Sequence, residues 1–257
     1  MPTGAAMARR SDAGARRAPQ HWGLDLHTPT TMNASSPRFD IYAPIHKALR
    51  LFMNDTLLRL SRLDLGDAQD LAAGLAQLDA LLDAAGCHLQ HENDFIHPAI
   101  EAGRSGASSR IATEHREHLD AIAMLRSQAA ALRAAPEAAA AHRLYRQLAA
   151  FIAENFEHMD VEETRHNQAL WAAYGDAELQ AIEGRILASI GPQEMALWLR
   201  WLLQALNPAE RAQLIAGLPP AARAPVLDMA RSLLDDTAWA KLCKAQGQAP
   251  VPGLVEA

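Results

Sequence analysis

From residue 39 onward, apolar residues recur at intervals of three and four, which is the spacing of one face of an α-helix. A helix of this kind buries its apolar face and leaves its polar face in water. Asp67 follows a break at Gly66 and can cap the second helix, and Pro136 fits the first turn of the fourth. The four predicted helices span about residues 40–62, 67–101, 109–134 and 136–174.

Short connections between long helices place successive helices side by side in opposite directions. We therefore expect an all-α fold, an antiparallel up-down four-helix bundle, over residues 39–175. Alanine and leucine dominate the composition and only 5% of the residues are aromatic, which favours helices over strands.

The chain stays helical after Gly175, but in shorter pieces that are separated by proline-containing breaks. These additional C-terminal helices are predicted over residues 176–189, 193–206, 208–217 and 222–245, within an extension of residues 176–257. Trp198 and Trp201 belong to a segment that is apolar nearly all round. Such a segment must pack on the bundle or on another subunit, so the extension is a candidate surface for a homo-oligomer or a protein partner.

The first 36 residues show no helical period and carry arginines among small and polar residues. We expect residues 1–38 to form a disordered tail. A leader that is rich in arginine and poor in acidic residues is typical of an organelle transit segment. The alternative is a leader that extends beyond a natural start at Met32.

Charge and hydropathy exclude two classes of partner. The net charge of -6 argues against nucleic acid, which binds basic surfaces. No apolar run approaches the ~20 residues that span a bilayer, so we expect a soluble protein without a membrane partner. Cys87 and Cys243 lie far apart and form no CxxC pair, which indicates reduced thiols and a cytoplasmic location.

Two segments share the spacing His-x-x-x-Glu: His88 to Glu92 in the second predicted helix and His158 to Glu162 in the fourth. Residues four apart stand on the same face of a helix, so each segment presents one imidazole and one carboxylate in the same direction. A single pair of this kind is common on a solvated helix face. Two facing pairs, in contrast, can hold two metal ions with the carboxylates as bridges.

All four predicted helices bring a ligand-type residue to a similar height in the bundle. His46 lies early in the first helix, and His115 and His118 lie early in the third, at the same end of the bundle as His88 and His158. Bridging carboxylates reduce the repulsion between two cations, and neutral imidazoles fill the outer positions. This donor set fits two iron ions, with manganese or zinc as substitutes.

The combined motifs resemble the hemerythrin-like family, also called the HHE cation-binding domain, over about residues 40–174. The matching motifs are Ile45-His46, His88-x-x-x-Glu92 followed by Phe95-Ile96-His97-Pro98, Glu114-His115, and His158-x-x-x-Glu162. The resemblance implies a non-haem di-iron centre with Glu92 and Glu162 as bridges. It implies His46, His88 and His158 as terminal ligands.

In the third helix, members of this family use one or two histidines as ligands. This chain spaces His115 and His118 by three, whereas the oxygen-carrying hemerythrins space theirs by four. The choice between His115, His118 and both therefore stays open, and simple oxygen carriage is less well supported.

The remaining histidines are not expected to bind metal. By helical angle, His97 points away from Glu92, and we expect it to lie in solvent together with His91. His166 follows Glu162 by four, which is compatible with a contact behind the metal ligands, but we expect it at the surface. Two further residues, each one helix turn before a candidate ligand, are expected to line the pocket or join the core: Tyr42 and Asn155.

Two kinds of function follow from these expectations. The first is a binding or sensing protein whose di-iron centre takes up dioxygen, nitric oxide or iron, while the extra helices report its state to a partner. The second is an enzyme that acts on peroxide or nitric oxide, or a donor of iron for the repair of iron–sulfur clusters. The sequence shows no second catalytic set beside the candidate ligands, such as a nucleophile with its base, which favours binding or sensing.

Overall fold

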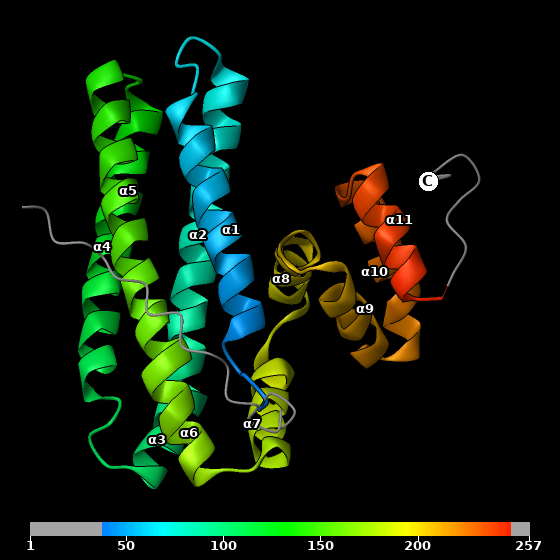
Figure 1. The fold of residues 1–257 in the computed structure, drawn as a ribbon. Coiled ribbons are helices and arrows are strands. Elements are labelled where there is room, and N and C mark those ends of the chain that lie inside the picture. The colour runs from blue at the N-terminus through cyan, green and yellow to red at the C-terminus, as the bar shows by residue number, and fades with distance from the viewer. Residues whose placement is uncertain (1–37, 248–257) are drawn as a thin grey trace, which may run out of the picture. The chain divides into compact units, whose positions relative to one another are not determined.

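The computed structural model describes residues 38–247, and every regular element in this range is a helix (Figure 1). The predicted all-α fold is therefore confirmed. The predicted disordered tail lies outside the described residues, except for Arg38. None of the helices between residues 38 and 247 has both the length and the apolar composition that crossing a bilayer takes.

Four long helices surround the main core (Figure 1): α1 (Ala43–Ser61), α2 (Ala68–His91), α4 (Ser109–Ala134) and α5 (Ala138–Val161). Helix α1 contacts α2 and α5, and α4 contacts the same two helices. The contacts therefore close into a ring of four. Large apolar side chains fill its centre, including Leu49, Phe52, Leu75, Leu78, Leu82, Leu125, Leu148 and Phe151. Complete burial of a side chain of this size contributes roughly 1.5–3 kcal/mol.

Ion pairs on the surface show the relative direction of α2 and α4. Arg126 pairs with Asp83, and Arg133 pairs with Asp79. Residue numbers fall along α2 as they rise along α4, so the two helices are antiparallel. Exposed pairs of this kind add little stability, but they record the register of the two helices.

The start of α2 follows the local signal in the sequence. The Asp67 side chain accepts hydrogen bonds from the backbone N–H groups of Gln69 and Asp70. These groups have no partner within the helix, so a capping side chain contributes about 1 kcal/mol.

Neither α2 nor α5 continues as a regular α-helix into the segment that follows it. A π-helical turn, η1 (Glu92–Ile96), joins α2 to α3 (His97–Gly103), and a second turn, η2 (Glu162–His166), joins α5 to α6 (Asn167–Ala173). In the first turn, the backbone N–H of His97 donates to the Glu92 carbonyl, five residues earlier. The prediction of regular α-helices through these positions is therefore wrong. Each π-helical turn is wider than an α-helical turn, so it changes the direction in which the following side chains point.

Different side chains accompany the two turns. Pro98 follows η1 and has no N–H to donate to the preceding turn, which removes one bond of a regular α-helix. Beside η2, the Asn167 side-chain amide donates to the Glu163 carbonyl, and the Thr164 hydroxyl donates to the Asp160 carbonyl. These bonds satisfy carbonyl groups at a position where the regular helix pattern changes.

Five shorter helices follow: α7 (Asp176–Ser189), α8 (Pro192–Ala205), α9 (Pro208–Gly217), α10 (Pro220–Leu233) and α11 (Asp236–Ala245). The single helix predicted over residues 222–245 is wrong. Leu234 has an extended backbone, and the Asp235 side chain caps α11 by accepting from the N–H of Ala238. The extended residue Leu234 ends α10, and the cap at Asp235 begins α11.

Helix α8 packs against α1 (Figure 1). The Trp201 ring stacks on Phe52, with ring centroids 4.1 Å apart. Lys47 of α1 also pairs with Glu210 of α9. The apolar segment around Trp201 was expected to pack either on the bundle or on another subunit. The structure shows it packed on the bundle. The division of the chain into a bundle and a separate extension stays a prediction.

Candidate metal centre

All seven histidines and glutamates that were predicted as metal ligands are buried. Six of them come together between α1, α2, α4 and α5, in two groups that share both glutamates: His46, His88, Glu92, His115, His158 and Glu162. Within each group, the ligand atoms lie within 4.8 Å of one another.

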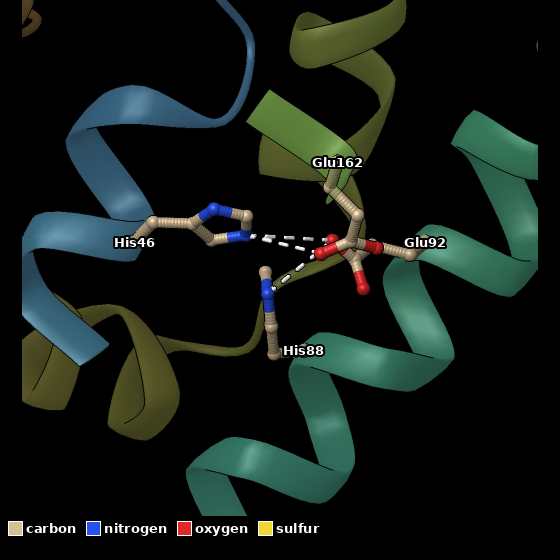
Figure 2. A group of neighbouring side chains, drawn as sticks. All are labelled: His46, His88, Glu92 and Glu162. Atoms are coloured by element: carbon tan, nitrogen blue, oxygen red, sulfur yellow. Dashed lines mark ion pairs between the residues drawn. The ribbon is translucent and has the colours of Figure 1, made fainter. Parts of the chain in front are cut away.

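The first group consists of His46, His88, Glu92 and Glu162 (Figure 2). Figure 2 shows both imidazoles pointing at the carboxylates. His46 Nε2 lies 3.7 Å from Glu92 Oε1 and 3.6 Å from Glu162 Oε2. His88 Nε2 lies 3.3 Å from Glu92 Oε1. Two nitrogen and two oxygen donors therefore face a common point.

The second group replaces the two imidazoles with those of His115 and His158. His115 Nε2 lies 3.4 Å from Glu92 Oε2 and 3.7 Å from Glu162 Oε1. His158 Nε2 lies 3.4 Å from Glu162 Oε1 and 3.2 Å from His115 Nε2. Each glutamate thus faces the first group with one oxygen and the second group with the other, as a bridge between two ions requires.

Most of the inner donor atoms of the centre lack a hydrogen bond within the described residues. All four carboxylate oxygens of Glu92 and Glu162, together with Nε2 of His46 and His88, are buried without a hydrogen-bond partner in residues 38–247. Burying polar atoms in this state costs several kcal/mol. Metal ions bonded to these atoms would remove the penalty, so the residues present fit a pair of cations.

The outer nitrogens of two imidazoles are held by carboxylates. His46 Nδ1 lies 3.0 Å from Glu163 Oε1, which also accepts from Arg50. His158 Nδ1 lies 2.9 Å from Glu114 Oε2. A carboxylate at Nδ1 favours the proton there, which fixes the ring and leaves the Nε2 lone pair facing inward. Both rings are therefore oriented as metal ligands.

His115 and His118 occupy different environments. His115 Nδ1 contacts Asn93 Oδ1 at 2.9 Å, which turns its Nε2 toward the two carboxylates. The His118 ring lies against His158 and Phe151, and His118 belongs to none of the donor groups found in residues 38–247. The geometry therefore favours His115 over His118 as a ligand.

Burial and the neighbouring carboxylates shift the pKa values of the imidazoles in opposite directions. Burial alone would lower the pKa of His46, but the hydrogen bond with Glu163 and the adjacent carboxylates of Glu92 and Glu162 outweigh it and raise that pKa to about 9. The pKa of His115 rises to about 9 because Glu162 and Glu92 outweigh its burial. Burial lowers the pKa of His88 to about 4.

The two glutamates stay ionised despite their position. Burial would raise the pKa of both carboxyl groups, but the surrounding imidazoles hold each pKa below its ordinary value. Two adjacent carboxylates are the anionic donors that a pair of cations needs.

His97 and His166 are buried, so their predicted placement in solvent or on the surface is wrong. Their side chains form a third donor group with Glu162. In a regular α-helix, a residue five positions after Glu92 lies well away from its face of the helix. The wider η1 turn changes this direction, and the His97 ring stacks on that of His115. For His166, the spacing of four from Glu162 was the signal that could have found it.

Tyr42 and Asn155 are both buried, as predicted. Tyr42 lines the centre, since its hydroxyl lies 3.3 Å from His166 Nδ1. The Asn155 amide donates to the Phe151 carbonyl within the same helix. Of the two residues, Tyr42 is the one in contact with a candidate ligand.

Comparison with known proteins agrees with this geometry. Residues 39–168 match the family model described as the hemerythrin HHE cation binding domain. Neither the comparison with curated proteins nor the comparison with solved structures gives a match. The match spans about half of the chain and contains both donor groups, whose buried histidines and glutamates fit a metal-binding protein. The chain belongs to the hemerythrin HHE cation-binding domain family.

Proposed function

We propose that the centre holds two metal ions, with Glu92 and Glu162 bridging both. His46 and His88 complete the ligands of one ion, and His115 and His158 complete those of the other. The observation that supports this most strongly is that both groups share the same two carboxylates, whose four oxygens are buried without a hydrogen-bond partner in the described part of the chain. His118, the seventh predicted ligand, has the weakest support.

We propose iron as the metal, with manganese or zinc as substitutes. Each ion would receive two imidazole nitrogens and carboxylate oxygens, a mixed donor set that suits iron and leaves coordination positions open. When bound, two such ions supply these open positions and one-electron exchange to a small ligand. The chain itself orients the imidazoles through Glu163 and Glu114 and surrounds the centre with buried side chains.

We propose that the protein binds or senses dioxygen, nitric oxide or iron, rather than acting as an enzyme. Sensing is supported by the position of α8, because the Trp198 and His88 rings lie with their centroids 6.4 Å apart. Trp198 and Trp201 also belong to the apolar core of the bundle. A movement of His88 would therefore reach the C-terminal helices, where a partner or a second subunit could detect it.

Elemental analysis of protein purified without added metal tests the proposal. We expect close to two iron ions per chain in the wild type and less than half of that in Glu162→Ala. Absorption spectra then separate the functions: a reversible adduct with dioxygen or nitric oxide supports binding, and steady consumption of peroxide or nitric oxide supports catalysis. Equal metal content in the wild type and the variant would contradict the site.

A further inference from the structure

His97 and His166 form a donor group with Glu162 that lies outside the two groups already described. The three ligand atoms lie within 4.8 Å of one another, and all three residues are buried. The rings of His97 and His166 meet edge to face, with centroids 5.6 Å apart. Both histidines directly follow or end a π-helical turn that begins at a bridging glutamate.

The inner nitrogens of this pair have no hydrogen-bond partner in the described part of the chain. Nε2 of His97 and Nε2 of His166 are buried and make no hydrogen bond within residues 38–247. The ring of His97 also stacks on the buried ring of His115, with centroids 4.8 Å apart, so this face of His97 is covered by a side chain of the centre. Packing alone leaves these two nitrogens unexplained, since buried polar atoms are normally hydrogen-bonded.

Tyr42 orients one of the two rings. Its hydroxyl lies 3.3 Å from His166 Nδ1, and the tyrosine is fully buried. When Nδ1–H donates to the hydroxyl oxygen, Nε2 of His166 carries the lone pair that a cation binds. The arrangement resembles that of His46 with Glu163, where an outer contact directs Nε2 inward.

We propose that His97, His166 and Glu162 form a third position for a divalent first-row transition ion, next to the pair of ions. This inference rests on the proposed function, because Glu162 serves both. Two imidazoles and one carboxylate bind such ions while leaving other coordination positions open. Since Glu162 is shared among all three positions, the third ion binds more weakly than the other two.

Equilibrium dialysis of the metal-free full chain against Co²⁺, followed by elemental analysis, tests this position. We expect the double variant His97→Ala/His166→Ala to bind one ion fewer than the wild type. Tyr42→Phe should keep the third ion but bind it with lower affinity. The control His142→Ala removes an exposed imidazole and should bind as many ions as the wild type.

Equal binding by the wild type and the double variant overturns the third position and leaves the two-ion centre intact. Binding of fewer than two ions by the wild type overturns the proposed function as well. If the double variant does not fold, anomalous scattering from Co²⁺-loaded crystals of the wild type tests the third position instead. A peak between Nε2 of His97 and Nε2 of His166 supports the proposal, and its absence at saturating Co²⁺ overturns it.

Discussion

Glu92 and Glu162 both turn one carboxylate oxygen toward His46 and the other toward His115. For Glu92 these oxygens are Oε1 and Oε2, at 3.7 and 3.4 Å from the imidazole nitrogens. For Glu162 they are Oε2 and Oε1, at 3.6 and 3.7 Å. Neither glutamate therefore belongs to one donor group alone, and the loss of either carboxylate should affect both groups.

Removal of a ligand should remove metal. We expect His158→Ala and Glu162→Ala each to lose most of the bound metal, because each deletes a donor of the buried groups. His142→Ala should keep the wild-type content, since His142 is exposed. Elemental analysis of the three purified variants measures this, and equal content in all three would remove the site assignment.

Loss of an outer contact should weaken metal binding without abolishing it. The Glu114 carboxylate accepts a hydrogen bond from Nδ1–H of His158. We expect Glu114→Ala to lower the affinity for metal by about 10–100-fold. Competition with a chelator of known affinity measures the change. Glu117→Ala is the matched control, because Glu117 lies exposed on the same helix. An equal loss in both variants would argue for a general charge effect instead of an oriented imidazole.

Chelation of the metal should lower the thermal unfolding midpoint. Ions that bind only the folded chain stabilise it, by about 2.7 kcal/mol for a site whose free ligand is at 100 times Kd. Calorimetry with and without a chelator measures the shift. Glu162→Ala, which is expected to keep less than half of the metal, should show a much smaller shift, and a chelator shift as large as that of the wild type would contradict the site.

The fluorescence of Trp198 should report on the centre. The centroid of its ring lies 6.4 Å from that of the His88 ring, so a bound transition ion should quench its emission. We expect titration with metal to quench the wild type, and Trp198→Phe to lose most of this response. Trp239→Phe should keep it, since Trp239 belongs to the separate apolar cluster of the C-terminal helices. A full response in Trp198→Phe would contradict the position of α8.

Glu101 should make the free energy of unfolding depend on pH, through its hydrogen bonds to the loop that precedes α4. Hydrogen bonds from the backbone N–H groups of Gly106 and Ser108 lower the pKa of Glu101 to about 2. The unfolded chain, with a pKa near its ordinary value, binds this proton first as the pH falls. The contribution is therefore present above the ordinary pKa of about 4.5 and is lost as the pH falls toward about 2. Denaturant titrations of metal-free Glu101→Gln should show a smaller stability loss over this range than the wild type.

Local signals in the sequence were sufficient for much of the fold. The apolar spacing predicted the four long helices, and Asp67 caps α2 as expected. The two His-x-x-x-Glu segments presented their pairs on one helix face, because the helix is still regular up to Glu92 and Glu162. This spacing accounts for four of the six ligands that come together, and the expected height of His46 and His115 in the bundle accounts for the other two.

Among the features of the structure that were not predicted are the burial of His97 and the break between α10 and α11. A regular helix places His97 away from Glu92, and only the π-helical turn, which is not visible in the apolar spacing, buries it. The break between α10 and α11 had a signal in Asp235, but apolar residues on both sides suggested one continuous helix.

Anomalous scattering from crystals of the iron-loaded wild type, collected at the iron edge, tests the central claim most directly. We predict two peaks, one between His46 and His88 and one between His115 and His158, both within bonding distance of Glu92 and Glu162. The peaks should lie roughly 3.5–4 Å apart. A single peak, or two peaks that share neither glutamate, would contradict a dinuclear centre bridged by these carboxylates.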